Sequence, residues 1–177
     1  MVEDQIDFKI VLPHWGHEYE YFPSEKIMKM GHAIVQAGAD LIVGSHPHVQ
    51  QPYEICLLNQ YPIEPKILNE NTKCQYSTRD GKKRKALILY SLGNFSTAMF
   101  TFPCELGVLA EISVTKNNLG VVDWFSPRAH LVINLNPMFS EKGRKLLLLK
   151  DHWSQEEMED HQVFQRTAYF FNFKDAW

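Results

Sequence analysis

The pattern of hydrophobic and polar positions predicts strand, helix and strand in the first quarter of the chain. Residues 6–12 alternate and then become continuously apolar, which is typical of a strand entering a core. Residues 24–38 begin with a capping serine, repeat apolar side chains at helical spacing and end at a glycine. Residues 41–43 are apolar again. This order predicts a βαβ unit with parallel strands and a right-handed crossover.

The later pattern predicts antiparallel strands. Residues 53–58 and 85–90 have the composition of a strand pair. Further strands, with one turn at Asn117-Asn118, are predicted at 107–114, 120–125 and 129–135. The fold class is therefore α/β with a mixed sheet, a βαβ unit followed by antiparallel strands.

Two segments fit this scheme less well. Residues 59–84 are polar and end in a basic run, which we interpret as a long solvated loop, or alternatively as a binding segment for a phosphate or polyanion. We predict a domain at residues 1–135 and a C-terminal extension at residues 136–177. The extension is expected to contain helices at 140–150 and 154–165. Its aromatic tail should dock on its own domain or on a partner chain.

Three histidines follow the first two predicted strands. His14 comes after the first strand, and His46 and His48 come after the second. The carboxyl ends of parallel strands share one edge of a sheet, where ligands bind in α/β folds. Pro47 favours extended backbone, which would point the imidazoles of His46 and His48 to the same side. The pattern favours a shared metal or phosphate site over solvated turn histidines.

Neighbouring polar residues leave alternatives open. His17 is a further candidate ligand or an exposed loop residue. Glu18 could fix an imidazole tautomer or remain a solvated charge. Asn94, in a glycine turn after residues 85–90, could hydrogen-bond a substrate oxygen or a ligand histidine, or only cap its turn.

Composition narrows the possible functions. The 177 residues carry a net charge of −3 with no basic bias, which argues against nucleic acid as a partner. No apolar run approaches the about 18 residues of a membrane helix. The three cysteines are odd in number and widely spaced, so we interpret them as reduced or incidental, without a disulfide framework or metal knuckle. Walker, Rossmann and serine-hydrolase glycine motifs are absent from the sequence.

The combined motifs over residues 6–115 resemble the CapA family of capsule or poly-γ-glutamate synthesis proteins, within the calcineurin-like metallophosphoesterase superfamily. The matching pieces, in the family's order, are His-Trp-Gly at 14–16 with Glu18-Tyr19, Ala-Gly-Ala-Asp at 37–40, Gly-Ser-His-Pro-His-Val at 44–49 with Gln51-Pro52 and Glu54, and Tyr-Ser-Leu-Gly-Asn-Phe at 90–95. The combination is far more specific than any single piece.

The resemblance implies a metal site. A lone histidine and a later His-x-His bind metal in this superfamily, which implies that His14 and His46 bind one ion and His48 another. Imidazole and carboxylate suit Mn, Fe or Zn. The superfamily's Asp-x-His, Gly-Asp-x-x-Asp and Asn-His segments, which supply a carboxylate between two ions, do not precede His14. We therefore expect the C-terminal half of a metallophosphoesterase-like α/β sandwich, or a truncated relative, with an incomplete site.

Two functions follow from the resemblance. The first is a metal-dependent phosphoesterase-like hydrolase of capsule or poly-γ-glutamate synthesis, with Asn94 and Glu18 supporting catalysis. Its partners would be an anionic polymer or phosphorylated substrate and the missing N-terminal half of the domain. The alternative is a non-catalytic binding or assembly component of an anionic-polymer synthesis or export system. Purely structural histidines are a third possibility. Family members commonly lie at the bacterial cell surface, and the compartment of this chain stays open.

Overall fold

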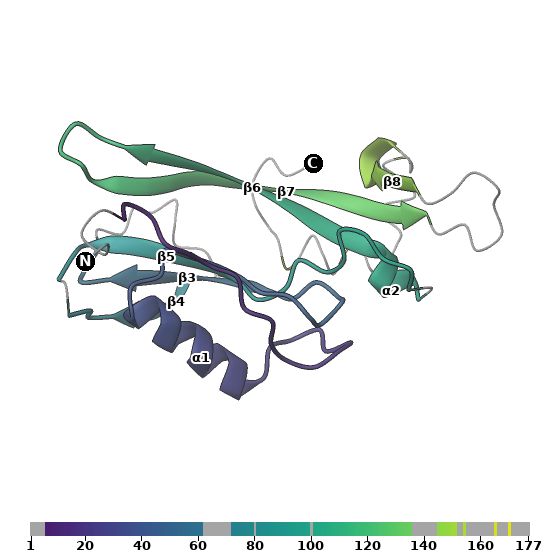
Figure 1. Ribbon diagram of the computed structural model, residues 1–177, viewed down its shortest axis with the longest axis horizontal. Helices are drawn as coiled ribbons and strands as arrows, with labels where there is room; N and C mark the ends of the chain where they lie inside the picture. The colour runs from purple at the N-terminus through teal and green to yellow at the C-terminus, as the bar shows by residue number, and fades with distance from the viewer. Residues whose placement is uncertain are drawn as a thin grey trace.

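A computed structural model describes residues 6–61, 72–79, 81–99, 101–135 and 145–151, with the single residues 154, 165 and 170. Figure 1 shows the elements in chain order. They are β1 (Ile10–Val11), α1 (Glu25–Gln36), β2 (Leu41–Val43), β3 (Tyr53–Leu58), β4 (Thr72–Tyr76), β5 (Arg84–Leu89), α2 (Phe102–Glu105), β6 (Leu106–Lys116), β7 (Val122–Leu135), β8 (Lys145–Leu148) and a short 3₁₀ turn, Leu149–Asp151.

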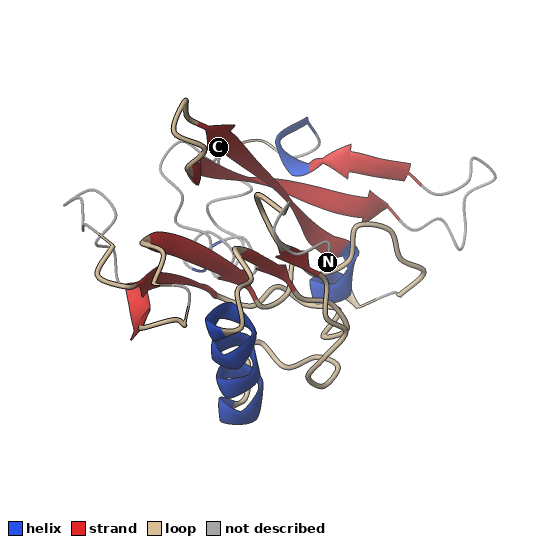
Figure 2. Ribbon diagram, turned by 60° about the vertical axis from the view of Figure 1, so that its left-hand side comes forward, coloured by secondary structure: helices blue, strands red, loops and turns tan. Residues whose placement is uncertain are grey.

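The described elements form three layers. A five-stranded sheet, in the order β1-β2-β5-β3-β4, is the middle layer, and the antiparallel sheet β6-β7-β8 covers one of its faces. Helix α1 covers the opposite face, as the two views show (Figures 1 and 2). The predicted fold class, α/β with a mixed sheet, is confirmed.

The βαβ prediction is also confirmed. Strand β1 pairs with β2 in parallel, and α1 connects them. Ser24 is the N-cap residue of α1, although its side chain makes no capping hydrogen bond. Gly38, with φ of +117°, ends the helix in a conformation that favours glycine. Strand β5 then pairs in parallel with β2, so β1, β2 and β5 all point toward the same edge of the sheet.

Alternating side chains of β5 fill two separate cores. Leu87 and Leu89 face the second sheet, where they pack in one cluster with Leu106, Leu131 and Ile133. Ala86, Ile88 and Tyr90 face α1 and join a second cluster that includes Val35 and Trp15. This strand is covered on both faces, which explains its continuous run of apolar residues.

Polar contacts connect the two sheets around Lys85. Its side chain is buried, and its ammonium lies 3.4 Å from Asp123 Oδ1 and 4.8 Å from the Trp124 ring centre. The indole of Trp124 donates to the backbone oxygen of Lys85 at 2.9 Å. Arg84 instead pairs with Asp40 at 2.8 Å. Two cations of the basic run are therefore structural, and do not contribute to a free polyanion-binding surface.

Several predicted boundaries differ from the structure. Residues Thr72–Tyr76 form β4 inside the predicted loop 59–84 and pair in parallel with β3. The strands predicted at 120–125 and 129–135 are one continuous strand, β7, whose register against β6 shifts between Glu111 and Ser113. Pairing with β6 on both sides of this shift, from Val122 to Ile133, outweighs the local break in the pattern. The predicted turn is confirmed, since Asn117 N–H donates to the oxygen of Val121.

The cysteine interpretation is wrong. Cys56 and Cys74 form a disulfide between β3 and β4, and only Cys104 is free. Cross-strand register, which spacing along the chain does not reveal, places Cys56 opposite Cys74. The bond closes a chain segment with a sequence separation of 18.

The C-terminal extension is described only in part. Residues 145–148 form strand β8 rather than the predicted helix, because they complete the edge of the second sheet against β7. Most of the helix predicted at 154–165 lies outside the described residues. Phe170 is 2% exposed and meets the Phe22 ring edge-on, so this residue of the aromatic tail docks on its own domain, one of the two alternatives that the sequence left open. In the described part of the chain, no helix is long and apolar enough to span a membrane.

Candidate metal centre

The candidate site lies where the three parallel strands end. His14 follows β1, His46 and His48 follow β2, and Asn94 follows β5. An isolated parallel bridge between His14 and Ser45 continues the pairing of β1 with β2 beyond the strands themselves. The structure therefore brings together the three histidines that the sequence placed at one edge of the sheet, and it adds Asn94 through the parallel pairing of β5 with β2.

The imidazoles form a compact group. The ring centres of His14 and His46 are 4.4 Å apart, and those of His46 and His48 are 5.9 Å apart. Possible ligand atoms of Glu18, His46 and His48 all lie within 4.8 Å of one another. His14 borders this triad through its contact with His46, whereas His17 is exposed and stands outside it.

The backbone around Pro47 is not extended, so that prediction is wrong. His46 has φ of +101° and His48 has φ of +60°, both in the left-handed region that non-glycine residues seldom adopt. Pro47 is buried between them, and its oxygen accepts a hydrogen bond from Tyr19 N–H at 2.8 Å. Such backbone costs about 1–3 kcal/mol per residue and is frequent at functional sites. The histidines converge through this tight loop rather than through strand periodicity.

Asn94 determines which nitrogen of His48 is available. The Asn94 amide nitrogen donates to the Cys104 oxygen at 2.9 Å, so its carbonyl Oδ1 is the atom that faces His48 Nδ1, at 2.8 Å. A carbonyl oxygen only accepts, so His48 Nδ1 must carry the proton. The lone pair is then on Nε2, the nitrogen nearer to Glu18. The pattern matches metal-binding histidines, whose second nitrogen donates to an oxygen.

Glu18 lies on the opposite side of the His48 ring from Asn94. Its Oε1 is 3.7 Å from His48 Nε2, and its side chain is 48% exposed. The tautomer-fixing position that the sequence suggested for Glu18 is therefore taken by Asn94. Glu18 instead places a carboxylate beside the nitrogen that would bind a metal.

Close backbone packing holds the loop that carries His14 against the loop that carries His46. The Trp15 indole donates to the Tyr90 backbone oxygen at 2.9 Å, and Trp15 N–H donates to the Ser45 oxygen at 3.1 Å. Gly44 leaves the room for this approach. A Cβ at Gly44 would lie 2.1 Å from the Tyr90 oxygen and 2.3 Å from Trp15 Nε1. The glycine before the histidines is thus needed for contact between neighbouring strand ends.

The donor set fits a divalent transition metal. Imidazole nitrogens with one carboxylate are typical ligands of Mn, Fe and Zn, and suit calcium or magnesium less well. Glu18 is the single carboxylate in this triad of described residues, so the triad neutralises little of the charge of two dications. The residues present fit one ion better than two.

The sequence prediction missed a second polar cluster, between α1 and β3. His32 Nε2 lies 2.6 Å from Glu54 Oε2, and the hydroxyls of Tyr76 and Tyr90 contact His32 Nδ1 and Glu54 at 2.9 Å each. Burial, followed by the charge of Glu54, raises the pKa of Tyr90 far above its ordinary value. The available signal was the alternation of Glu54 and Cys56 on one face of β3.

Comparison with known proteins agrees with the motifs. The family model described as "Bacterial capsule synthesis protein PGA_cap" matches residues 2–99, which include the three histidines at the sheet edge, Glu18 and Asn94. The chain is 45% identical over 49 residues to the PGA biosynthesis protein CapA of Bacillus subtilis, covering 28% of this chain and 13% of that protein. It is 34% identical over 89 residues to the capsule biosynthesis protein CapA of Bacillus anthracis, covering 50% of this chain and 15% of that protein.

The matches show the family of the chain but cover only a small part of each relative. The aligned segments span about one seventh of the length of these two relatives, so the activity of a whole relative is not carried over with them. The family model, however, covers more than half of the 177 residues. The chain therefore belongs to the bacterial capsule synthesis protein family, as its CapA motifs predicted.

Proposed function

We propose that this chain carries the histidine-bearing part of a metal-dependent, phosphoesterase-like hydrolase site that acts in the synthesis of an anionic capsule polymer such as poly-γ-glutamate. One observation carries the proposal. Asn94 holds the proton of His48 on Nδ1 and so directs an unprotonated Nε2 toward Glu18 and His46. A solvated turn histidine needs no such partner.

Each residue would have a distinct role in binding the metal. His46, His48 and Glu18 would hold a first divalent ion, and His14 would add a further imidazole at the edge of the group. Asn94 positions His48 and does not itself bind the ion. When bound, such an ion supplies Lewis-acid polarisation of a phosphoryl oxygen and a more acidic water. The exposed positions of His14 and Glu18 leave room for an anionic substrate to approach.

The position of β1 supports completion of the site by further protein. β1 is the outermost strand at its end of the sheet, and Ile10 and Leu12, before His14, are 56% and 74% exposed. A segment packed against this edge would cover the two apolar side chains and could supply carboxylates next to the histidines. A second ion would need such additional anions, because two dications require a bridging negative charge.

A second candidate is a binding or assembly component that does no chemistry. The single carboxylate in the triad favours it, since one carboxylate and neutral imidazoles can hold one ion without forming a two-metal hydrolytic centre. In that case the metal would serve to bind an anionic polymer.

Titration of the chain with Mn²⁺ by calorimetry tests the site. We expect about one ion per chain, and a fall in affinity of about 10-fold or more in His46→Ala and in His48→Ala. His130→Ala is the matched control, because His130 lies on β7 and pairs with Glu111 at 3.1 Å, away from the sheet edge. Equal binding by all four proteins would refute the metal centre.

Turnover separates the two candidates. A longer chain that adds the family's Asp-x-His and Asn-His segments should hydrolyse an aryl phosphate in the presence of Mn²⁺, and His48→Ala should abolish the activity. Metal binding without turnover in that longer chain would leave the binding component as the function.

A further inference from the structure

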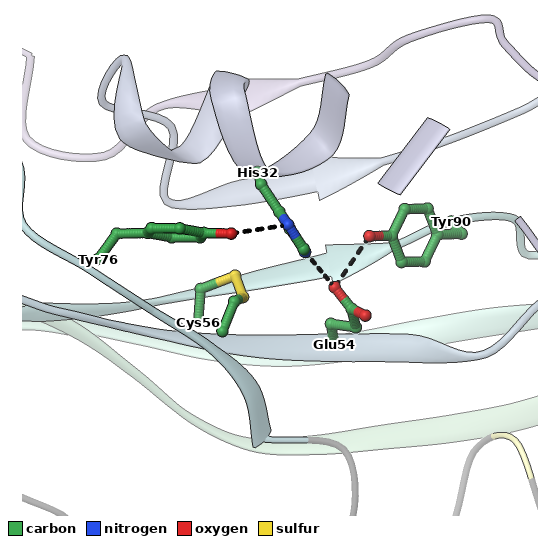
Figure 3. The surroundings of a disulfide bond; sticks show 6 residues. His32, Glu54, Cys56, Tyr76 and Tyr90 are labelled. Atoms are coloured by element: carbon green, nitrogen blue, oxygen red, sulfur yellow. Dashed lines mark hydrogen bonds and ion pairs between the residues drawn. A yellow bond between two sulfur atoms is a disulfide. The ribbon is translucent and has the colours of Figure 1, made fainter. Parts of the chain in front are cut away.

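A second group of possible metal ligands lies on the face of the middle sheet that α1 covers. It consists of Cys56 from β3, Cys74 from β4 and His32 from α1, whose ligand atoms all lie within 4.8 Å of one another. Figure 3 shows His32 reaching down from the helix toward the disulfide and toward Glu54. The two cysteines are 0% and 3% exposed, whereas the His32 side chain is 19% exposed.

The surroundings of His32 resemble those of a metal-binding histidine. Glu54, two residues before Cys56 on the same face of β3, lies 2.6 Å from His32 Nε2. Tyr90 O–H donates to the same Glu54 oxygen at 2.9 Å, which orients the carboxylate (Figure 3). A carboxylate that accepts from one imidazole nitrogen fixes the ring and strengthens the other nitrogen as a ligand. That other nitrogen, Nδ1, now contacts the hydroxyl of Tyr76 at 2.9 Å.

We propose that Cys56, Cys74 and His32 form a redox-gated site for a thiophilic divalent cation of the Zn²⁺ class. In the oxidised chain the disulfide uses both sulfur atoms and the site is closed. A dithiol reductant opens it: the Cys56–Cys74 bond accepts two electrons and two protons, and the reductant becomes a disulfide. Binding of Zn²⁺ to the two thiols then releases their two protons to solvent.

The ligand types favour zinc over the ions expected at the sheet edge. Two thiolates and an imidazole are typical zinc ligands, with a water available as the fourth. Two thiolates also cancel the charge of one dication, which lowers the cost of burying it. His32 would bind through Nδ1 once the Tyr76 hydroxyl has moved aside, while Nε2–H donates to Glu54.

The redox-gated site is independent of the proposed capsule function. No residue is shared between the two groups, and each can fail alone. The experiment therefore uses the whole chain carrying His46→Ala and His48→Ala, so that zinc bound at the sheet edge is not counted.

The test compares oxidised and reduced protein. Each form is mixed with Zn²⁺, freed of excess metal and analysed by native mass spectrometry. We expect about one zinc per chain after reduction and none before it. Co²⁺ in place of zinc should produce an ultraviolet thiolate charge-transfer band in the reduced form alone.

Variants locate the bound ion. Cys56→Ser/Cys74→Ser should abolish reduction-dependent binding, whereas Cys104→Ser, which alters the free buried cysteine, should retain it. Glu54→Gln should weaken binding by about 10–100-fold through His32. A reduced chain that stays folded without taking up zinc overturns the proposal. So does equal uptake by both redox forms, or unfolding on reduction in spite of added zinc.

Discussion

Single side chains outside the ligand set decide whether the histidines can act. Asn94 is the clearest case, because its amide joins the Cys104 oxygen to His48 Nδ1 and so fixes both the ring and its tautomer. The motif marked Asn94 as a candidate but left it between a turn cap and a site residue. The structure gives it a contact that a turn cap does not require.

Asn94→Ala should weaken Mn²⁺ binding by about 10–100-fold, because His48 loses the acceptor that keeps its proton on Nδ1. Calorimetric titration measures the loss. Asn118→Ala, in the exposed hairpin turn, is the matched control and should bind as the unaltered chain does. Unchanged affinity in Asn94→Ala would show that the amide only supports the turn.

Gly44→Ala should lower the free energy of unfolding by about 1–3 kcal/mol, because a Cβ there meets backbone and indole atoms that cannot easily withdraw. Urea denaturation measures the change. Gly31→Ala is the control, since its Cβ would make ordinary contacts at 3.4–3.5 Å and alanine favours the helix. If both variants lose the same stability, the close approach at Gly44 is not responsible.

At the scale of elements, one buried cation joins the two sheets in addition to the apolar core between them. Lys85 belongs to β5 in the middle sheet, and its ammonium lies among Asp123, Trp124 and Phe125 of β7 in the second sheet. Tyr61 adds a hydrogen bond to Asp123 at 2.6 Å. The basic run that ends at Lys85 was expected to be exposed to solvent, yet tertiary packing buries Lys85 itself.

Lys85→Met should cost about 1–3 kcal/mol of stability, because Asp123 loses a buried cationic partner while the apolar stem remains. Lys116→Met is the matched control. Lys116 also pairs with an aspartate, Asp7 at 2.7 Å, but both side chains are more than half exposed, so the loss should be under about 1 kcal/mol. Urea denaturation of both variants tests this; similar losses would contradict a special role for the buried pair.

At the scale of the whole molecule, the disulfide links two neighbouring strands whose cysteines are 18 residues apart in the sequence. It joins β4, the edge strand of the middle sheet, to the neighbouring strand β3. The same bond lies beneath α1, beside the polar cluster around His32 (Figure 3).

Reduction of the disulfide in the presence of a chelator should lower the free energy of unfolding by about 3 kcal/mol, because the unfolded chain regains the entropy of a closed loop of this length. Urea denaturation with and without a dithiol measures it. In Cys56→Ala/Cys74→Ala the reductant should have no effect. An unchanged midpoint in the unaltered chain would mean that the bond does not constrain the unfolded state.

The sequence by itself determined the βαβ unit, the antiparallel strands joined at Asn117-Asn118 and the common edge for His14, His46 and His48. These follow from hydrophobic periodicity, turn residues and the fixed hand of the crossover, all of which act over short stretches of chain. The family followed from the spacing and order of motifs along the same stretches.

Only the tertiary structure decided the rest. The left-handed backbone of His46 and His48, the pairing of Cys56 with Cys74 and the burial of Lys85 each involve contacts between segments distant in sequence. The proton position on His48 likewise depends on Asn94, 46 residues away. Local pattern sets which face a side chain takes, whereas contacts across the sheet and between layers set which side chains meet there.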